Sequence, residues 1–317
     1  MLSHYEQAAR TFLPELARSL GAEPLRGLHR LSGWRHALVA IQPPIALAAA
    51  VWVILSWPHL WYAWVPASVL IGFCVFSLTT LLHEVVHQTV FAVRRPRLNR
   101  LLGHLYAIPS GLSQTQFTRW HLDHHDALGT TDQDPKRAYL SPKRHARWFK
   151  ALYMTPALFP IYFRAAKKAA ADYPPELRRQ IRIERLAAVL LHLTIPVVLT
   201  LTLGFEAALK LHLLPVFLVF PVAFTINRLG QHYDVDPDDP AAWGTLMRPS
   251  PWLWDRLYLC SNYHLEHHYF TRVPCYRMPA LRRLLQPFFD GRGIRPRRYG
   301  GLLWDWFVRN ATPHTRW

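Results

Sequence analysis

The chain has 317 residues, of which 51% are hydrophobic and 13% aromatic, and its formal net charge at pH 7 is +17. Several apolar stretches approach the roughly 20 residues that a helix needs to cross a bilayer, which excludes an ordinary water-soluble protein. The Arg and Lys residues are dispersed between these stretches, and no nucleic-acid-binding motif is present, so no nucleic-acid partner is expected. The charge indicates a basic surface that faces membrane lipids or an acidic protein.

The first part of the chain is predicted to be helical. Residues 1–36 form an amphipathic segment, because leucines recur on one face and arginines on the other. The first membrane span is expected at about residues 37–57, with a kink at Pro43 and Pro44. The second is expected at about residues 61–82, after an aromatic turn that is typical of a membrane interface.

The remainder alternates between polar and apolar segments. Residues 92–185 are largely polar and contain one apolar stretch, ALYMTPALFPIYF, which is too short to span and is predicted to lie at the membrane surface or re-enter it. The third and fourth spans are expected at about residues 186–203 and 211–226. The spans form one domain, residues 37–285, and residues 286–317 form a C-terminal cytoplasmic tail.

The distribution of positive charge predicts the orientation. The two short loops between paired spans carry a single positive residue, Lys210, whereas the other polar segments hold nearly all the remaining Arg and Lys. Since positive loops stay on the cytoplasmic side, both termini are expected there. We therefore predict an all-α polytopic membrane protein with four transmembrane helices and a cytoplasmic helical cap.

Histidines are concentrated in three short stretches. The sequence contains 18 His, and eight of them are spaced i,i+4 or i,i+3,i+4, which places each cluster on one helix face. All three clusters fall on the predicted cytoplasmic side, beyond spans two and four. Crowded imidazoles repel one another when protonated and need partners when buried and neutral, and metal coordination meets both conditions. These residues are His83, His87, His121, His124, His125, His264, His267 and His268.

Two other readings use fewer of these side chains. A membrane zinc peptidase would need only His83, Glu84 and His87, the H-E-x-x-H pattern, and would leave six clustered His unexplained. A haem-binding electron carrier would need paired His within facing spans, whereas the clusters follow the span ends. Eight nitrogen donors exceed the four ligands of one zinc ion, and two metal ions with open positions suit redox iron.

At these residues the sequence resembles the membrane-bound fatty-acid desaturase superfamily, which includes hydroxylases, carotenoid ketolases and alkene-forming decarboxylases. The shared pattern is H-x(3,4)-H followed by two H-x-x-H-H boxes, and the resemblance covers about residues 40–285. The stretches TTDQDP and NYHLEHHYFTRVPCYRMPAL also look like bacterial members. The resemblance implies two iron ions (Fe2+/Fe3+) held by the eight His, with His232 in INRLGQHYD as a ninth ligand.

Several residues are candidates to support the metal ligands, among them the acidic residues near the histidine triplets such as Asp126, Asp132 and Asp134. Asp123 and Glu266 each sit inside a histidine triplet and are expected to orient imidazoles through their second nitrogens. In acyl-CoA desaturases an Asn four residues before the ninth His holds a water on one iron. Here Arg228 occupies that position, and Asn227, five residues before His232, is the nearest substitute.

The resemblance implies O2-dependent oxidation of an unactivated C–H bond in a fatty acid or acyl lipid, with desaturation as the leading reaction. Hydroxylation and oxidative decarboxylation to a terminal alkene are alternatives on the same scaffold, because positioning of the chain selects the outcome. No electron-transfer domain is fused, so a ferredoxin, rubredoxin or similar donor with its reductase is expected. The basic face would attract such a donor or anionic membrane lipids, and the expected location is a bacterial inner membrane.

Overall fold

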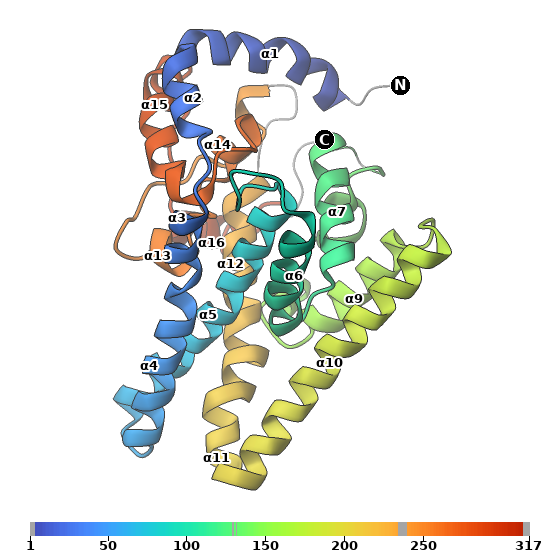
Figure 1. Cartoon of the computed structure of the whole chain (residues 1–317), viewed down its shortest axis with the longest axis vertical. Helices are drawn as coiled ribbons and strands as arrows, with labels where there is room; N and C mark the ends of the chain where they lie inside the picture. Colours follow the sequence, from blue (N-terminus) through green and yellow to red (C-terminus); the bar gives the residue numbers. More distant parts are fainter. Residues whose placement is uncertain (1–3, 129, 131, 234–239, 313–317) are drawn as a thin grey trace.

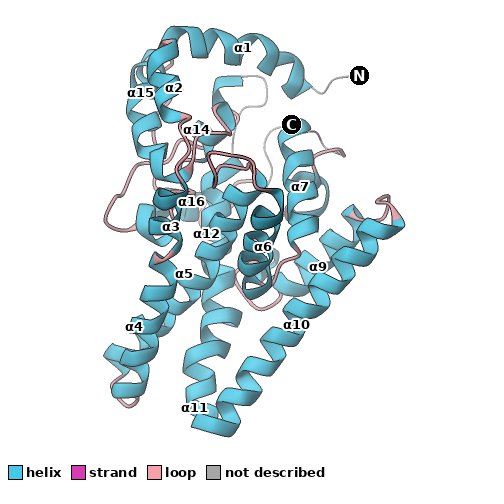
Figure 2. Cartoon of the chain, in the orientation of Figure 1, coloured by secondary structure: helices cyan, strands magenta, loops and turns pink. Residues whose placement is uncertain are grey.

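The computed structural model of the chain describes all residues except 1–3, 129, 131, 234–239 and 313–317. The described residues form helices joined by loops and contain no strand (Figure 2). Met247 and Arg297 form an isolated β-bridge, which belongs to no strand. The prediction of an all-α protein is therefore confirmed.

Within the described residues, four helical segments are long and apolar enough to cross a membrane. They are Gly33–Ser56, Trp61–Val86, Pro175–Leu203 and Phe205–His232. Each overlaps one of the predicted spans. The third begins 11 residues before the predicted span 186–203, and the fourth begins six residues before and ends six residues after the predicted span 211–226. The extra turns carry polar residues that project beyond the apolar region. The chain is an integral membrane protein with four transmembrane helices.

The first span is interrupted just before the proline pair at which the sequence predicts a kink. It consists of α3 (Gly33–Ala40) and α4 (Gln42–Ser56), which meet at Ile41, two residues before Pro43. Pro43 and Pro44 occupy the first turn of α4. Proline is tolerated there because its missing N–H would have no partner within the helix.

The second and fourth spans form the centre of the bundle, and the other two lie at its periphery. The second span is α5 (Trp61–Val86). The fourth consists of α11 (Phe205–Ala208), the π-helical turns η3 (Leu209–Leu213) and η4 (Pro215–Val219), and α12 (Phe220–His232). In contrast, α4 and α10 (Pro175–Leu203) expose large apolar side chains such as Trp52, Leu193 and Leu201, which suit contact with lipid.

The central spans approach closely at a glycine. A Cβ atom added to Gly72 on α5 would lie 2.5 Å from Cβ of Val219 and 2.9 Å from the carbonyl oxygen of Pro215. Only a residue without a side chain fits this contact. Small residues allow close backbone approach between membrane helices. Here Gly72 brings α5 against η4, which continues into the helix that carries His232.

The remaining helices cap one end of the bundle. In Figure 1, α1 (His4–Leu20), α2 (Ala22–Leu28) and α15 (Met278–Gly291) lie at the end opposite the turn between α10 and α11. The cap also contains α6 (Pro96–Ala107), α7 (Gln114–Asp126), α8 (Arg147–Leu152), α9 (Leu158–Ala169), α13 (Trp254–Leu257), α14 (His264–Tyr269) and α16 (Tyr299–Phe307). Leu16 of α1 packs with Leu281 and Phe289 of α15 in one apolar core. The amphipathic N-terminal segment thus covers the C-terminal part of the chain.

The described part of the C-terminal tail packs against the membrane domain. Leu302 and Trp306 of α16 are buried in a core with Phe220 of α12 and Tyr153. Lys150 of α8 is buried and donates to the carbonyl oxygens of Trp306 and Ala311. The short apolar stretch that contains Tyr153 forms the end of α8, a turn and the start of α9, so it belongs to the cap and to this core.

Candidate metal centre

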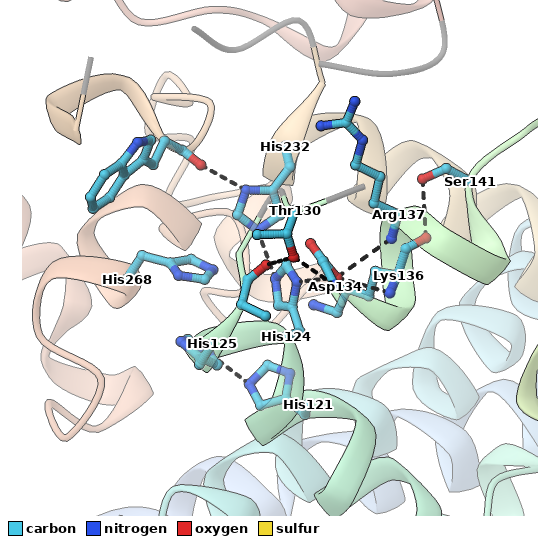
Figure 3. A network of polar contacts seen from close by, with 12 residues as sticks. His121, His124, His125, Thr130, Asp134, Lys136, Arg137, Ser141, His232 and His268 are labelled. Atoms are coloured by element: carbon cyan, nitrogen blue, oxygen red, sulfur yellow. Dashed lines mark hydrogen bonds and ion pairs between the residues drawn. The ribbon is translucent and has the colours of Figure 1, made fainter. Parts of the chain in front are cut away.

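The nine predicted histidine ligands come from four helices that end at the same place. His83 lies in the last turn of α5, and His87 immediately follows that helix. His232 is the last residue of α12. The two triplets lie on α7 and α14. Figure 3 shows His121, His124 and His125 of α7 beside His232 and His268.

The structure divides these histidines into two groups that each suit a metal ion. Among the described residues, one group takes five and the other four, with the ligand atoms of each within 4.8 Å of one another. The first consists of His83, His87, His121, His125 and His267, and the second of His124, His232, His264 and His268.

Each triplet contributes to both groups, in opposite ways. On α7, the i,i+4 pair His121 and His125 joins the five-histidine group, and His124 joins the four-histidine group. On α14, the i,i+4 pair His264 and His268 joins the four-histidine group, and only His267 joins the other. The short helices α7 and α14 therefore link the two groups into one centre.

Distances between imidazole nitrogens are those of ligands around an ion. The Nε2 atom of His121 lies 2.8 Å from that of His87 and 2.9 Å from that of His125. In the other group, Nε2 of His232 lies 2.8 Å from that of His264 and 3.1 Å from that of His124. A metal–nitrogen bond of about 2.1 Å places two nitrogens at right angles about 3.0 Å apart. The residues present thus fit a pair of metal ions.

Burial keeps the imidazoles in the neutral form that binds metals. Desolvation lowers the pKa of the candidate ligand histidines outside the membrane spans well below the usual value, and neighbouring imidazoles lower it further. These residues are His121, His124, His125, His264, His267 and His268. Lys136 adds to the shift in every one of them except His267 and His268. Protonation would compete with coordination, so a site that disfavours it retains metal more strongly.

Two ligands of the four-histidine group are oriented through their second ring nitrogen. Nδ1 of His124 lies 2.9 Å from Oδ1 of Asp134, and Nδ1 of His232 lies 2.8 Å from the carbonyl oxygen of Trp243 (Figure 3). An acceptor at Nδ1 holds the proton there and leaves the lone pair of Nε2 for the metal. In the five-histidine group, Nδ1 of His83 lies 3.8 Å from the Glu84 carboxylate.

The carboxylates proposed from the triplets have other partners in the structure. Asp123 pairs with Arg119 at 3.0 Å, and buried Glu266 pairs with Arg282 at 3.5 Å. Burial raises the pKa of Glu266 to about 7, although Arg282 opposes the shift. Within the described residues, no direct contact between either carboxylate and a ligand imidazole is recorded. The orienting carboxylate is Asp134, which lies ten residues after His124.

Asn227 lies next to the centre without contacting a ligand nitrogen. Its amide donates to Oγ of Ser261 at 2.8 Å, and its carbonyl oxygen accepts from Gln231 at 3.0 Å. It lines the same cavity as His83 and His264. A role for Asn227 beside the metal ligands stays a prediction, because the resemblance places that Asn at position 228, which is Arg here.

A cavity of about 110 Å³ adjoins both groups of histidines. Its wall includes His83, His121, His264 and His267 together with apolar side chains such as Phe76, Leu112, Leu140 and Phe224. Apolar walls beside the centre suit a hydrocarbon chain. Two basic residues, Lys136 and Arg228, also line the cavity. In the sequence Arg228 stands out only as a departure from Asn, and nothing in the spacing of Lys136 marks it as part of the site.

A bundle of four membrane-spanning helices that presents nine convergent imidazoles at one end defines the class of histidine-box integral membrane proteins. The sequence model of the family described as fatty acid desaturase matches residues 59–300, and the chain belongs to this family. It is an oxidoreductase that acts on lipid acyl chains.

Curated relatives with defined activities are similar over most of the chain. The human sphingolipid delta(4)-desaturase/C4-monooxygenase DES2 is 27% identical over 264 residues, which are 77% of this chain and 73% of the relative. The Drosophila melanogaster sphingolipid delta(4)-desaturase DES1 is 28% identical over 222 residues, which are 69% of this chain and 65% of the relative. The family match, residues 59–300, includes the central spans and all three histidine clusters.

Proposed function

We propose that the protein uses two iron ions and O2 to oxidise an unactivated C–H bond of a fatty acyl chain, and that the principal reaction is desaturation. The observation that supports this most directly is the pair of neutral, buried histidine groups beside an apolar cavity. Nine nitrogen donors and no convergent thiolate or carboxylate set in the described residues suit a borderline redox metal such as iron.

Each part of the chain has a defined task in this reaction. When bound, the iron ions supply the activation of O2 that removing hydrogen from an alkyl carbon requires. Asp134 and the carbonyl oxygen of Trp243 hold His124 and His232 with Nε2 directed at the centre. The apolar wall orients the chain and excludes water, which fixes the carbon that is attacked.

The balance of the reaction requires an external electron source. Conversion of a CH2–CH2 unit and O2 into CH=CH and two waters consumes two electrons and two protons. We propose that a ferredoxin, rubredoxin or similar protein, with its reductase, supplies the electrons on the cytoplasmic side. A surface pocket lined by Arg94, Arg95, Arg100 and Arg272 adds to the basic face that such an acidic partner would contact. We propose that both termini lie on this side and that the membrane is a bacterial inner membrane, because positively charged loops stay in the cytoplasm.

Hydroxylation is the second candidate, because the human relative is described as both a desaturase and a monooxygenase. Hydroxylation inserts one oxygen atom, whereas desaturation removes two hydrogens, and the position of the chain decides between them. A zinc peptidase would use only His83, Glu84 and His87. It would leave the four-histidine group without a role, although that group is the more completely buried of the two.

The decisive experiment combines metal analysis with product analysis. Purified protein is loaded with iron and incubated with ferredoxin, reductase, NADPH, O2 and saturated acyl substrates, and the products are identified by mass spectrometry. Loss of two hydrogens supports desaturation, gain of one oxygen supports hydroxylation, and loss of CO2 supports decarboxylation. Active protein that contains one zinc and no iron would contradict the proposal.

A further inference from the structure

Lys136 and Arg228 bring two positive side chains into the apolar cavity beside the metal centre. Lys136 begins the π-helical turn η2 (Lys136–Leu140), and Arg228 lies one helical turn before His232 on α12. Both line the same cavity as His83, His121, His264 and His267. Figure 3 shows Lys136 beside Asp134 and His124. Residues 92 positions apart in the chain thus meet at this wall.

The positive charge at this wall is only partly compensated. In the described part of the chain, neither the Nζ of Lys136 nor the guanidinium of Arg228 has a recorded hydrogen bond or ion pair, although Arg228 lies over the Phe224 ring. Asp134 is the nearby acid, but its Oδ1 already accepts from His124 and from the backbone N–H of Lys136. Glu84, the acidic residue in the cavity wall, accepts from Thr89 and the backbone N–H of Cys275.

The metal ligands add no negative charge to balance these cations. Imidazoles bind metal in the neutral form, so bound ions would keep their full positive charge. Burial first, and then repulsion by Arg228, lower the pKa of Lys136 well below its usual value although Asp134 opposes the shift, so a cation in this wall carries a free-energy cost. A negative group that entered the cavity would remove this cost, whereas a neutral group would not.

We infer that Lys136 and Arg228 bind the carboxylate of a free fatty acid, so that the acyl substrate of the proposed oxidation enters as the free acid. Arg presents a planar fork that matches a carboxylate in two parallel hydrogen bonds, and Lys adds a third donor. An amide, ester or thioester carbonyl is neutral and leaves both cations unpaired. This inference rests on the proposed function, since it names the substrate of the same site.

A carboxylate bound at this wall also determines which carbon of the acyl chain is oxidised. The first carbons of the chain are held at the wall that carries the histidines, and the methyl end extends into the remaining space. The position of attack is therefore fixed from the carboxyl end. Substrates of different length would be oxidised at the same carbon number.

The first test measures binding without turnover. Iron-loaded protein in detergent is equilibrated with radiolabelled dodecanoate, and competition by unlabelled dodecanoate is compared with competition by its methyl ester. Lys136→Met and Arg228→Met are each expected to weaken dodecanoate binding about 10-fold or more, as loss of a charge-assisted hydrogen bond predicts. The weak binding of the methyl ester should stay unchanged. Lys136→Arg should restore most of the dodecanoate affinity.

Controls separate this effect from unfolding and from failure of the proposed function. Lys167→Met and Arg144→Met remove exposed cations of the cap and should leave dodecanoate binding unchanged. Iron content and gel-filtration profiles identify variants that do not fold. Equal affinity of the wild type for acid and ester, or an equal loss for both ligands in Lys136→Met, would overturn the inference. If the protein binds the free acid in preference to the ester but oxidises no acyl chain, the proposed function is contradicted and the inference about the carboxylate is not.

The second test examines the products. Dodecanoate, tetradecanoate and hexadecanoate are expected to be oxidised at the same carbon, counted from the carboxyl group, as mass spectrometry of derivatised products would show. A position that stays constant from the methyl end would contradict anchoring of the carboxylate.

Discussion

Nδ1 of His124 and Oδ1 of Asp134 lie 2.9 Å apart, and both side chains are almost completely buried. Asp134 also accepts from the backbone N–H of Lys136, which fixes the carboxylate relative to its own loop. The loop after α7 is thereby connected to the four-histidine group. A carboxylate in this position both orients the imidazole and increases its basicity as a ligand.

Replacement of Asp134 by Asn should therefore weaken the four-histidine group. Asn has a similar shape but a neutral acceptor, so His124 loses the charge that orients it. We expect iron affinity or activity to fall about 10- to 100-fold, the range found for such supporting residues. Elemental analysis and product formation measure the loss. Asp132→Asn, an exposed neighbour, is the matched control, and an equal effect in both variants would contradict the assignment.

Removal of one imidazole from each group tests whether both groups bind metal. His267→Ala should reduce occupancy of the five-histidine group, and His124→Ala should reduce occupancy of the four-histidine group. Each variant should contain less iron than the wild type and lose oxidation of acyl chains. His59→Ala, in the exposed turn between the first two spans, should retain both. Full turnover by either ligand variant would remove that residue from the centre.

Glu84 is expected to act in folding and not as a hydrolytic base. Its Oε2 atom accepts from Oγ1 of Thr89 at 2.8 Å and from the backbone N–H of Cys275 at 2.9 Å. Glu84→Ala leaves the buried N–H of Cys275 without this acceptor, at a cost of about 1–3 kcal/mol. Thr89 keeps its second acceptor, the backbone carbonyl oxygen of Glu84.

Thermal unfolding in detergent would measure the effect of Glu84→Ala. A lower melting temperature is expected for Glu84→Ala, a smaller decrease for Glu84→Gln, and none for the exposed control Glu15→Ala. Peptide hydrolysis that requires Glu84 and proceeds without O2 would support the zinc peptidase instead.

The contact at Gly72 makes a prediction about packing. Gly72→Ala places a methyl group 2.5 Å from Cβ of Val219, a distance that forces α5 away from η4. Overpacking of this kind costs about 1–3 kcal/mol. Because η4 continues into the helix of His232, reduced iron binding should accompany the lower melting temperature. Gly27→Ala, whose new methyl group meets no atom within 4 Å, is the control and should be neutral or slightly stabilising.

Docking of an acidic electron donor through the basic face should depend on salt. The second-order rate of electron transfer from ferredoxin, measured by stopped-flow spectroscopy, should fall about 10-fold or more between low and high ionic strength. Arg95→Glu should slow association further at low salt while leaving turnover with a small chemical reductant unchanged. If the rate of electron transfer does not change with ionic strength, docking through the basic face is contradicted, and contact with anionic membrane lipids explains the positive charge.

Much of the architecture could be predicted from the sequence. Apolar stretches of sufficient length specify the four spans, and i,i+3,i+4 spacing specifies which faces of α7 and α14 carry imidazoles, because both depend on neighbours along one helix. The extra turns of α10 were missed, since hydropathy does not show where a polar helix continues beyond the apolar region.

The division of the histidines could not be predicted from spacing. His124 meets His232, 108 residues later, and His125 meets His267, 142 residues later. Adjacent positions on one helix thus belong to different groups, depending on how α12 and α14 pack against α7. The same holds for the carboxylates, since Asp123 and Glu266 lie inside the triplets but pair with arginines.

The sequence by itself determined a four-span membrane protein with three imidazole-bearing surfaces, because helix length and side-chain periodicity are local properties of the chain. Only the tertiary structure decided which nitrogens converge, that Asp134 orients His124, and that Lys136 and Arg228 line one cavity. Those relationships join segments far apart in the chain, and the packing of α5, α7, α12 and α14 sets the distances between them.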